Sequence, residues 1–132
     1  LEADLAGLGV EARVREVPGA HPAVIGRVDA AGGPHVLFYG HYDVQPVDPL
    51  PLWETPPFEP RLATLPDGRK VIVARGASDD KGQVMTFVEA CRAWKAVTGS
   101  LPLGITFLIE GEEENGSRGL PEFVASIRDE LK

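Results

Sequence analysis

His41 and Asp43 stand two residues apart at the end of the apolar run 36–40. Side chains two residues apart in a strand point to the same face, so this imidazole and this carboxylate would lie together. Two acidic clusters follow, Asp79-Asp80 and residues 112–114, each beside a glycine-containing turn. Hydrolytic metal centres combine imidazole ligands with carboxylates, one of which takes a proton. We therefore expect the three segments to converge on a metal site.

Each segment also has a plainer interpretation. His41 could end a strand with Asp43 in the following turn, and Asp79 or Asp80 could cap the helix that begins near residue 82. Residues 112–114 could form a solvated acidic loop. All three clusters, however, come directly after apolar runs, where open α/β sheets bind their ligands. This shared position favours one common site over three coincidences.

Composition narrows the class of protein. The chain has 132 residues, 43% of them hydrophobic and 25% charged, as expected for one globular domain. The net charge of −7 argues against nucleic acid or an anionic membrane surface as the main partner. No apolar run approaches the roughly 20 residues that span a bilayer. The single cysteine, Cys91, cannot form an internal disulfide, which makes a cytoplasmic location the expectation.

Hydrophobic patterning predicts the elements that carry the clusters. Helices are expected over residues 2–8, 82–97 and 121–131, and strands over residues 10–17, 23–28, 36–39, 70–74 and 103–109. The run 36–39 is continuously apolar, which predicts a strand buried on both faces. Seven prolines between residues 44 and 70 predict a long irregular loop. Helix 82–97 followed by strand 103–109 predicts a crossover in a partly parallel sheet, and hence an α/β fold.

The three clusters resemble the metal-binding motifs of the M20 metallopeptidase family. Residues 37–46 (LFYGHYDVQP) resemble the first motif, and residues 53–58 (WETPPF) its continuation in the dipeptidase, carnosinase-like branch. Residues 74–82 (ARGASDDKG) are similar to the second motif and residues 109–117 (IEGEEENGS) to the third. The resemblance implies a three-layer zinc-exopeptidase-like catalytic domain, with a mixed, mostly parallel sheet flanked by helices.

The resemblance also implies a set of metal ligands. His41 would bind one zinc ion, Asp79 would bridge two, and Glu114 would bind the other. Asp80 would not be a ligand, and the peptide bond between Asp79 and Asp80 would be cis. Two Zn²⁺ ions per active site are expected, although mixed nitrogen and oxygen ligands also suit Mn²⁺ or Co²⁺.

The implied activity is hydrolysis of the peptide bond of a dipeptide or short peptide by a metal-activated water. Glu113 would be the general base, Asp43 would orient His41, and Glu112 would be a bystander. Two alternatives remain open. The substrate could be an N-acyl amino acid, as for a deacylase of the same family, or the chain could be a truncated domain without catalytic activity.

Residues 1–132 are expected to form only part of a catalytic domain. In the family that the motifs resemble, a further acidic ligand and a second histidine ligand follow the third motif, beyond Lys132 here. The lid domain, through which the intact protein would form a homodimer, would also lie there. The isolated fragment is therefore expected to be inactive.

Overall fold

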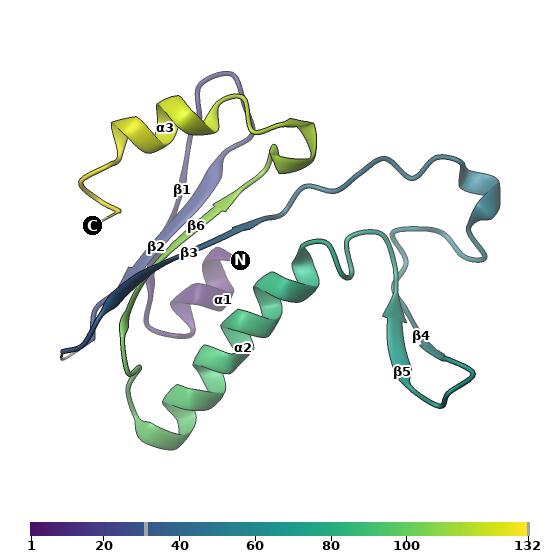
Figure 1. The fold of residues 1–132 in the computed structure, drawn as a ribbon, viewed down its shortest axis with the longest axis horizontal. Coiled ribbons are helices and arrows are strands. Elements are labelled where there is room, and N and C mark those ends of the chain that lie inside the picture. The colour runs from purple at the N-terminus through teal and green to yellow at the C-terminus, as the bar shows by residue number, and fades with distance from the viewer. Residues whose placement is uncertain (31, 132) are drawn as a thin grey trace.

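The computed structural model describes residues 1–30 and 32–131, in which a four-stranded sheet has helices on both faces (Figure 1). The main elements are α1 (Glu2–Ala6), β1 (Glu11–Arg15), β2 (Ala23–Val28), β3 (His35–His41), β4 (Arg61–Thr64), β5 (Lys70–Val73), α2 (Lys81–Thr98), β6 (Gly104–Glu110) and α3 (Leu120–Ser126). Short 3-10 helices span Leu50–Leu52 (η1) and Glu113–Asn115 (η2). Helices α1 and α2 pack against one face of the sheet and α3 against the other, which confirms the three-layer α/β expectation.

The main sheet has the strand order β1-β2-β6-β3. Strands β3 and β6 are parallel, whereas the β1–β2 and β2–β6 pairs are antiparallel. The mixed sheet is confirmed, but within the described residues it is less parallel than expected. The reason is that β1 and β2 form a hairpin-like antiparallel pair before α2 makes its crossover. The parallel pair aligns His41 with Glu110, so the segments that follow both residues leave the sheet at the same edge.

The expectation that residues 36–39 are buried on both faces is wrong. Strand β3 pairs only with β6 in the described part of the chain, and Leu37 and Tyr39 are 49% and 45% exposed. Helix α3 packs Phe123 against a cluster that contains Leu108 of β6, so it covers the middle of the sheet rather than β3. Strand β6, in contrast, is buried along its whole length.

Helix α2 attaches the second acidic cluster to the sheet. Its side chains Val84, Val88 and Cys91 recur at helical spacing and are buried. Phe87 stacks on Phe38 of β3, with ring centroids 4.1 Å apart. Trp94 and Val97 in the last turns of the helix are 51% and 86% exposed. The buried part of α2 is thus the half nearest to Asp79 and Asp80.

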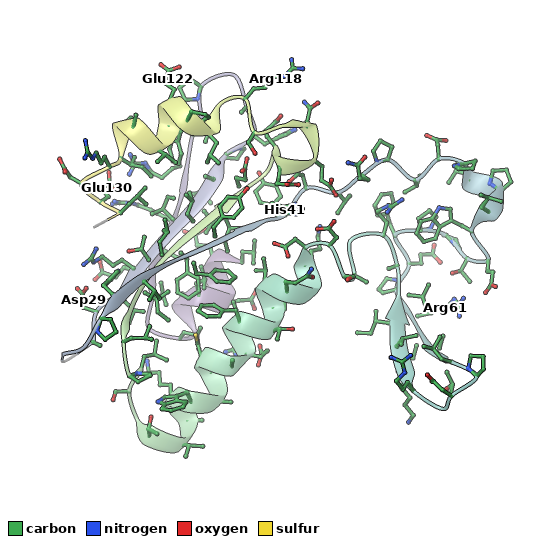
Figure 2. All side chains as sticks on the ribbon, in the orientation of Figure 1. Asp29, His41, Arg61, Arg118, Glu122 and Glu130 are labelled. Atoms are coloured by element: carbon green, nitrogen blue, oxygen red, sulfur yellow. The ribbon has the colours of Figure 1, made fainter. Side chains whose placement is uncertain are left out.

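The proline-rich segment is partly more regular than expected. Residues 44–60 contain only the 3-10 helix η1, but β4 was not predicted and pairs antiparallel with β5. The predicted Asp67-Gly68 turn joins the two strands, with Gly68 at φ 86°. This hairpin, which carries Arg61, projects from the three-layer body (Figure 1, Figure 2). Strand β4 was missed because its short alternating pattern lies among prolines.

The other predicted boundaries differ at their ends. Strand β2 matches its predicted range, and β6 differs from its predicted range by one residue at each end. Helix α3 ends at Ser126, short of the predicted residue 131, and residues 127–130 form turns. In the described residues, no helix combines the length and the apolar character needed to cross a membrane.

Gly40 lets β3 approach α2 closely, so a side chain added at this position should destabilise the fold. A Cβ at this position would lie 2.6 Å from Val84 Cγ2 and 3.0 Å from Asp80 Oδ2. Gly40→Ala is therefore expected to lower the free energy of unfolding by about 1–3 kcal/mol, measured by urea denaturation. Gly32→Ala is the control, because a Cβ there has no neighbour within 4 Å. Equal losses in both variants would contradict the close-packing argument.

Candidate metal centre

His41 is the buried centre of the site, with its side chain 7% exposed. It ends β3 where the chain leaves the sheet (Figure 2). Its Nδ1 lies 3.2 Å from Asp43 Oδ1, and its Nε2 lies 3.1 Å from Asp79 Oδ1. Asp43, two residues beyond the end of β3, thus lies against one ring nitrogen as expected, and a second carboxylate faces the opposite ring nitrogen.

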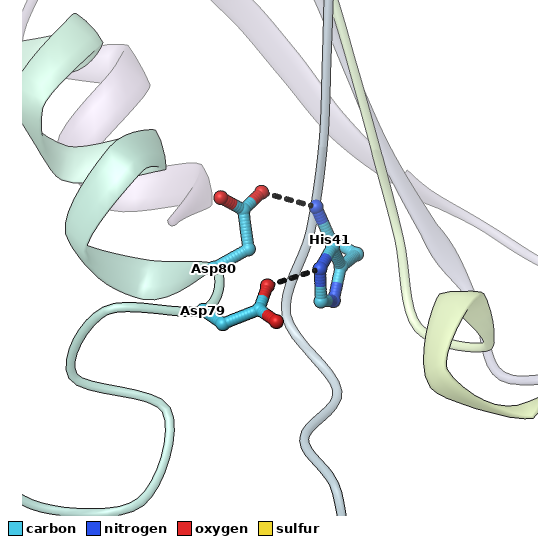
Figure 3. Close-up of side chains that lie close together, drawn as sticks. All are labelled: His41, Asp79 and Asp80. Atoms are coloured by element: carbon cyan, nitrogen blue, oxygen red, sulfur yellow. Dashed lines mark hydrogen bonds and ion pairs between the residues drawn. The ribbon is translucent and has the colours of Figure 1, made fainter.

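Asp79 and Asp80 approach His41 from the loop that precedes α2 (Figure 3). Asp80 occupies the N-cap position of α2, but its side chain makes no capping hydrogen bond. Its Oδ2 instead accepts the backbone N–H of His41 at 3.1 Å. Asp80 therefore ties the start of α2 to the end of β3 and leaves Asp79 to face the imidazole. The peptide bond between the two aspartates is cis, as the motif resemblance implied.

The three side chains form a group that could hold a cation. One nitrogen or oxygen atom from each of His41, Asp79 and Asp80 lies within 4.8 Å of the others. Imidazole nitrogen and carboxylate oxygen are ligands that zinc and other divalent transition metals accept. Asp79 is exposed while His41 is buried, so the group opens to solvent on the side of Asp79. The donor set fits a divalent metal ion.

The third segment meets the first through Asp43. The backbone N–H groups of Glu113 and Glu114 donate to the Asp43 carboxylate at 3.3 and 2.9 Å. The Glu113 carboxylate lies 3.7 Å from His41 Nε2, on the same side of the ring as Asp79. The structure therefore brings His41, Asp43, Asp79 and Glu113 together.

Glu114 is placed differently from the other expected site residues. Its carboxylate accepts a hydrogen bond from Gln45 Nε2 at 2.7 Å and is not in the group around His41. The zinc-binding role of Glu114 stays a prediction. Glu112 accepts the backbone N–H of His21 at 3.2 Å, so its side chain contacts another segment. Its role as a bystander also stays a prediction.

Sequence reasoning assigned no role to Gln45 or to Glu110. Gln45 lies within the first motif, and its position four residues after His41 was the available signal. Glu110 is 4% exposed at the end of β6 and contacts the hydroxyls of Tyr39 and Ser117. An acidic residue that ends a fully apolar strand was the signal for Glu110.

The neighbouring carboxylates change the protonation of His41. Burial by itself lowers the pKa of His41, but the hydrogen bond to Asp79 and the negative charges of Asp80, Glu113 and Asp43 outweigh burial. The net result is a pKa above the ordinary value of 6.5. A histidine binds a metal ion only in its neutral form, so a cation that binds His41 displaces the second ring proton.

Comparison with known proteins was consistent across sequence and structure. The family model described as peptidase family M20/M25/M40 matches residues 37–132. The human protein named Beta-Ala-His dipeptidase is 44% identical over 94 residues, which cover 71% of this chain and 18% of the human protein. The Cys-Gly metallodipeptidase DUG1 of Candida albicans is 37% identical over 105 residues, which cover 79% of this chain and 21% of the yeast protein.

Solved structures share the fold as well. The M20 family metallo-carboxypeptidase Sso-CP2 from Sulfolobus solfataricus superimposes with a TM-score of 0.84 at 37% identity. The superposition covers 99% of this chain and 28% of the Sulfolobus chain. The matched part of this chain thus spans about a fifth of the length of its curated relatives, 18% and 21% in the two cases above.

Proposed function

The chain belongs to peptidase family M20/M25/M40, and from this membership we propose that it is part of a metal-dependent dipeptidase. The observation that carries the proposal is the arrangement around His41. Asp43 lies behind the ring at 3.2 Å, Asp79 faces it at 3.1 Å, and Glu113 stands beside it at 3.7 Å. Two potential ligands, an orienting carboxylate and a free carboxylate are the parts that hydrolysis by an activated water requires.

The proposed cofactor is a pair of Zn²⁺ ions, with Mn²⁺ or Co²⁺ as alternatives. His41 would hold one ion, Asp79 would bridge both, and Glu114 would hold the other. The proximity of His41 and Asp79 supports the first two assignments. For Glu114 the support is its backbone bond to Asp43, which keeps the residue beside the site. Asp80 is assigned to holding His41 in place rather than to the metal.

When bound, the metal ions supply Lewis-acid chemistry that lowers the pKa of a water and polarises the substrate carbonyl. Glu113 accepts the proton of the attacking water and donates it to the leaving amine. Its carboxylate is 43% exposed, so substrate and water can reach it. Asp43 accepts a hydrogen bond from the Nδ1–H of His41, which would leave Nε2 available to hold a metal ion.

Dipeptides are the proposed substrates. The two curated relatives described above carry the dipeptides Beta-Ala-His and Cys-Gly in their names, and the structural relative is named a carboxypeptidase. All three names describe cleavage of peptide bonds, which favours a peptidase over a deacylase of N-acyl amino acids.

The test uses the longest natural polypeptide that contains these residues. It is assayed against a panel of dipeptides and matched N-acyl amino acids, with and without a metal chelator. We expect dipeptide hydrolysis that the chelator abolishes and that added Zn²⁺ or Mn²⁺ restores. Hydrolysis of the N-acyl amino acids alone would establish the deacylase instead, and activity that survives the chelator would contradict the metal-dependent proposal.

The domain organisation of the whole protein is proposed from the same family membership. Residues 1–132 form part of the catalytic domain, and the rest of that domain and a lid domain that mediates a homodimer would complete the protein. Since the matched residues span 18% of the human relative, the remaining ligands would come from the missing part. The isolated chain would then be inactive. Cys91 is the single cysteine, which supports a reducing cytoplasmic location.

A further inference from the structure

We propose that Glu110 is a positioning residue for the turn that carries Glu113. The turn comprises residues 112–117 and includes the 3-10 helix η2. Glu110 itself does not lie among the metal-binding side chains. This inference rests on the proposed function only in giving Glu113 the role of general base. The contacts that hold the turn do not depend on that role.

Glu110 is buried and accepts two hydrogen bonds through one of its carboxylate oxygens. The residue is 4% exposed, and its Oε1 accepts the hydroxyl of Tyr39 at 2.5 Å and the hydroxyl of Ser117 at 2.7 Å. A buried carboxylate is costly unless hydrogen bonds replace its water. Burial raises the pKa of Tyr39, and the hydrogen bond to Glu110 raises it further. The phenol therefore keeps its proton and remains a donor. Tyr39 and Ser117 are thus linked across 78 residues of sequence by a single acceptor atom.

Ser117 transmits this link to the turn. It has φ 49°, in the left-handed region that residues other than glycine rarely adopt. In this conformation its backbone N–H donates to Glu112 O at 2.8 Å, and Gly116 N–H donates to Glu113 O at 2.9 Å. The hydroxyl bond to Glu110 therefore holds Ser117 in the conformation that closes the turn.

Residues 112–117 also position the groups around His41. Their amide groups at Glu113 and Glu114 donate to Asp43, whose Oδ1 lies 3.2 Å from His41 Nδ1. A displaced turn would remove two donors from Asp43 and move the Glu113 carboxylate away from the ring. Glu110 thus acts on the catalytic groups through Ser117 and the backbone of the turn, without touching them itself.

The experiment compares Glu110→Ala, Glu110→Gln and Ser117→Ala in the metal-loaded full-length enzyme. The matched controls are Glu122→Gln and Ser126→Ala in α3, where Glu122 is exposed and the hydroxyl of Ser126 donates to Phe123 O of its own helix. Hydrogen exchange of the amides of residues 112–117 is measured together with kcat, KM and metal content.

Glu110→Ala is expected to speed exchange at Glu113 and Glu114 by about tenfold or more. It should lower kcat with little change in KM, because it displaces a group that acts in the transition state. It should also lower the metal content, because the same turn carries Glu114 and supports Asp43 behind His41. Ser117→Ala should change both measurements in the same direction by less. Glu110→Gln should restore most of both, because its amide oxygen can still accept both hydroxyls. The two α3 controls should match the wild type.

Unchanged exchange in the turn for both Glu110→Ala and Ser117→Ala would overturn the proposal. Exchange that rises equally in β6 and in the turn would also overturn it, because Glu110 would then serve general stability. A Glu110→Gln variant as impaired as Glu110→Ala would contradict the hydrogen-bond account. If the wild type hydrolyses no dipeptide, the proposed function fails, but the exchange measurements still decide the role of Glu110.

Discussion

Replacement of Glu113 by glutamine is expected to reduce dipeptide turnover in the full-length enzyme by about 100- to 10,000-fold. Glutamine has nearly the shape of glutamate but cannot accept the proton of the attacking water. Glu113 is proposed to be the base rather than a ligand, so the bound metal should stay near the wild-type amount. The measurements are kcat with a good dipeptide substrate and metal content by elemental analysis of the purified protein.

Glu112→Gln is the matched control for this variant. It makes the same chemical change one residue earlier in the turn, at a side chain that bonds to the backbone of His21. Its turnover should equal that of the wild type. Wild-type turnover in Glu113→Gln would move the base elsewhere, and equal losses in both variants would show that the total charge of the turn matters rather than one carboxylate.

Asp79→Asn is expected to weaken cation binding by at least about 100-fold, with a parallel loss of turnover. Groups that only support metal ligands typically change metal affinity by about 10- to 100-fold, and a bridging ligand should matter at least as much. Asparagine keeps the shape of the side chain but removes the negative charge that faces His41 Nε2 at 3.1 Å. Calorimetric titration with Zn²⁺ measures the loss directly.

The variant Asp80→Asn distinguishes the roles of the two adjacent aspartates. Asp80 Oδ2 accepts the backbone N–H of His41, and the amide oxygen of asparagine can accept the same hydrogen bond. This variant should therefore retain most of the affinity for Zn²⁺ and most of the stability to urea. If Asp80→Asn loses the cation while Asp79→Asn retains it, the two residues exchange their assigned roles.

Local pattern was sufficient for most of the secondary structure and for the polar segments that meet at the end of β3. The helical spacing of apolar residues in α2, the β-branched run in β6 and the alternation in β1 each depend on neighbours in sequence, so their ranges agree with the structure within about two residues. The parallel β3–β6 pair then brings the ends of two strands to one edge, which is why residues 41–43 and 112–114 meet as expected. The sequence named His41, Asp43 and, through the resemblance to the third motif, Glu113, and their roles in binding and catalysis stay predictions.

What the sequence by itself determined about this protein is its family, its α/β class and the set of polar residues at the ends of its strands. The tertiary structure alone decided which atoms those residues face. It decided that Asp79 faces the imidazole while Asp80 holds the end of β3, that Gln45 donates to the Glu114 carboxylate, and that Leu37 and Tyr39 of β3 are exposed. Strand order and the side-chain contacts between distant segments set these outcomes, and the bond from Tyr39 to Glu110 joins residues 71 positions apart. A local pattern specifies which residues are apolar or charged, but it does not specify which distant segment will lie against them.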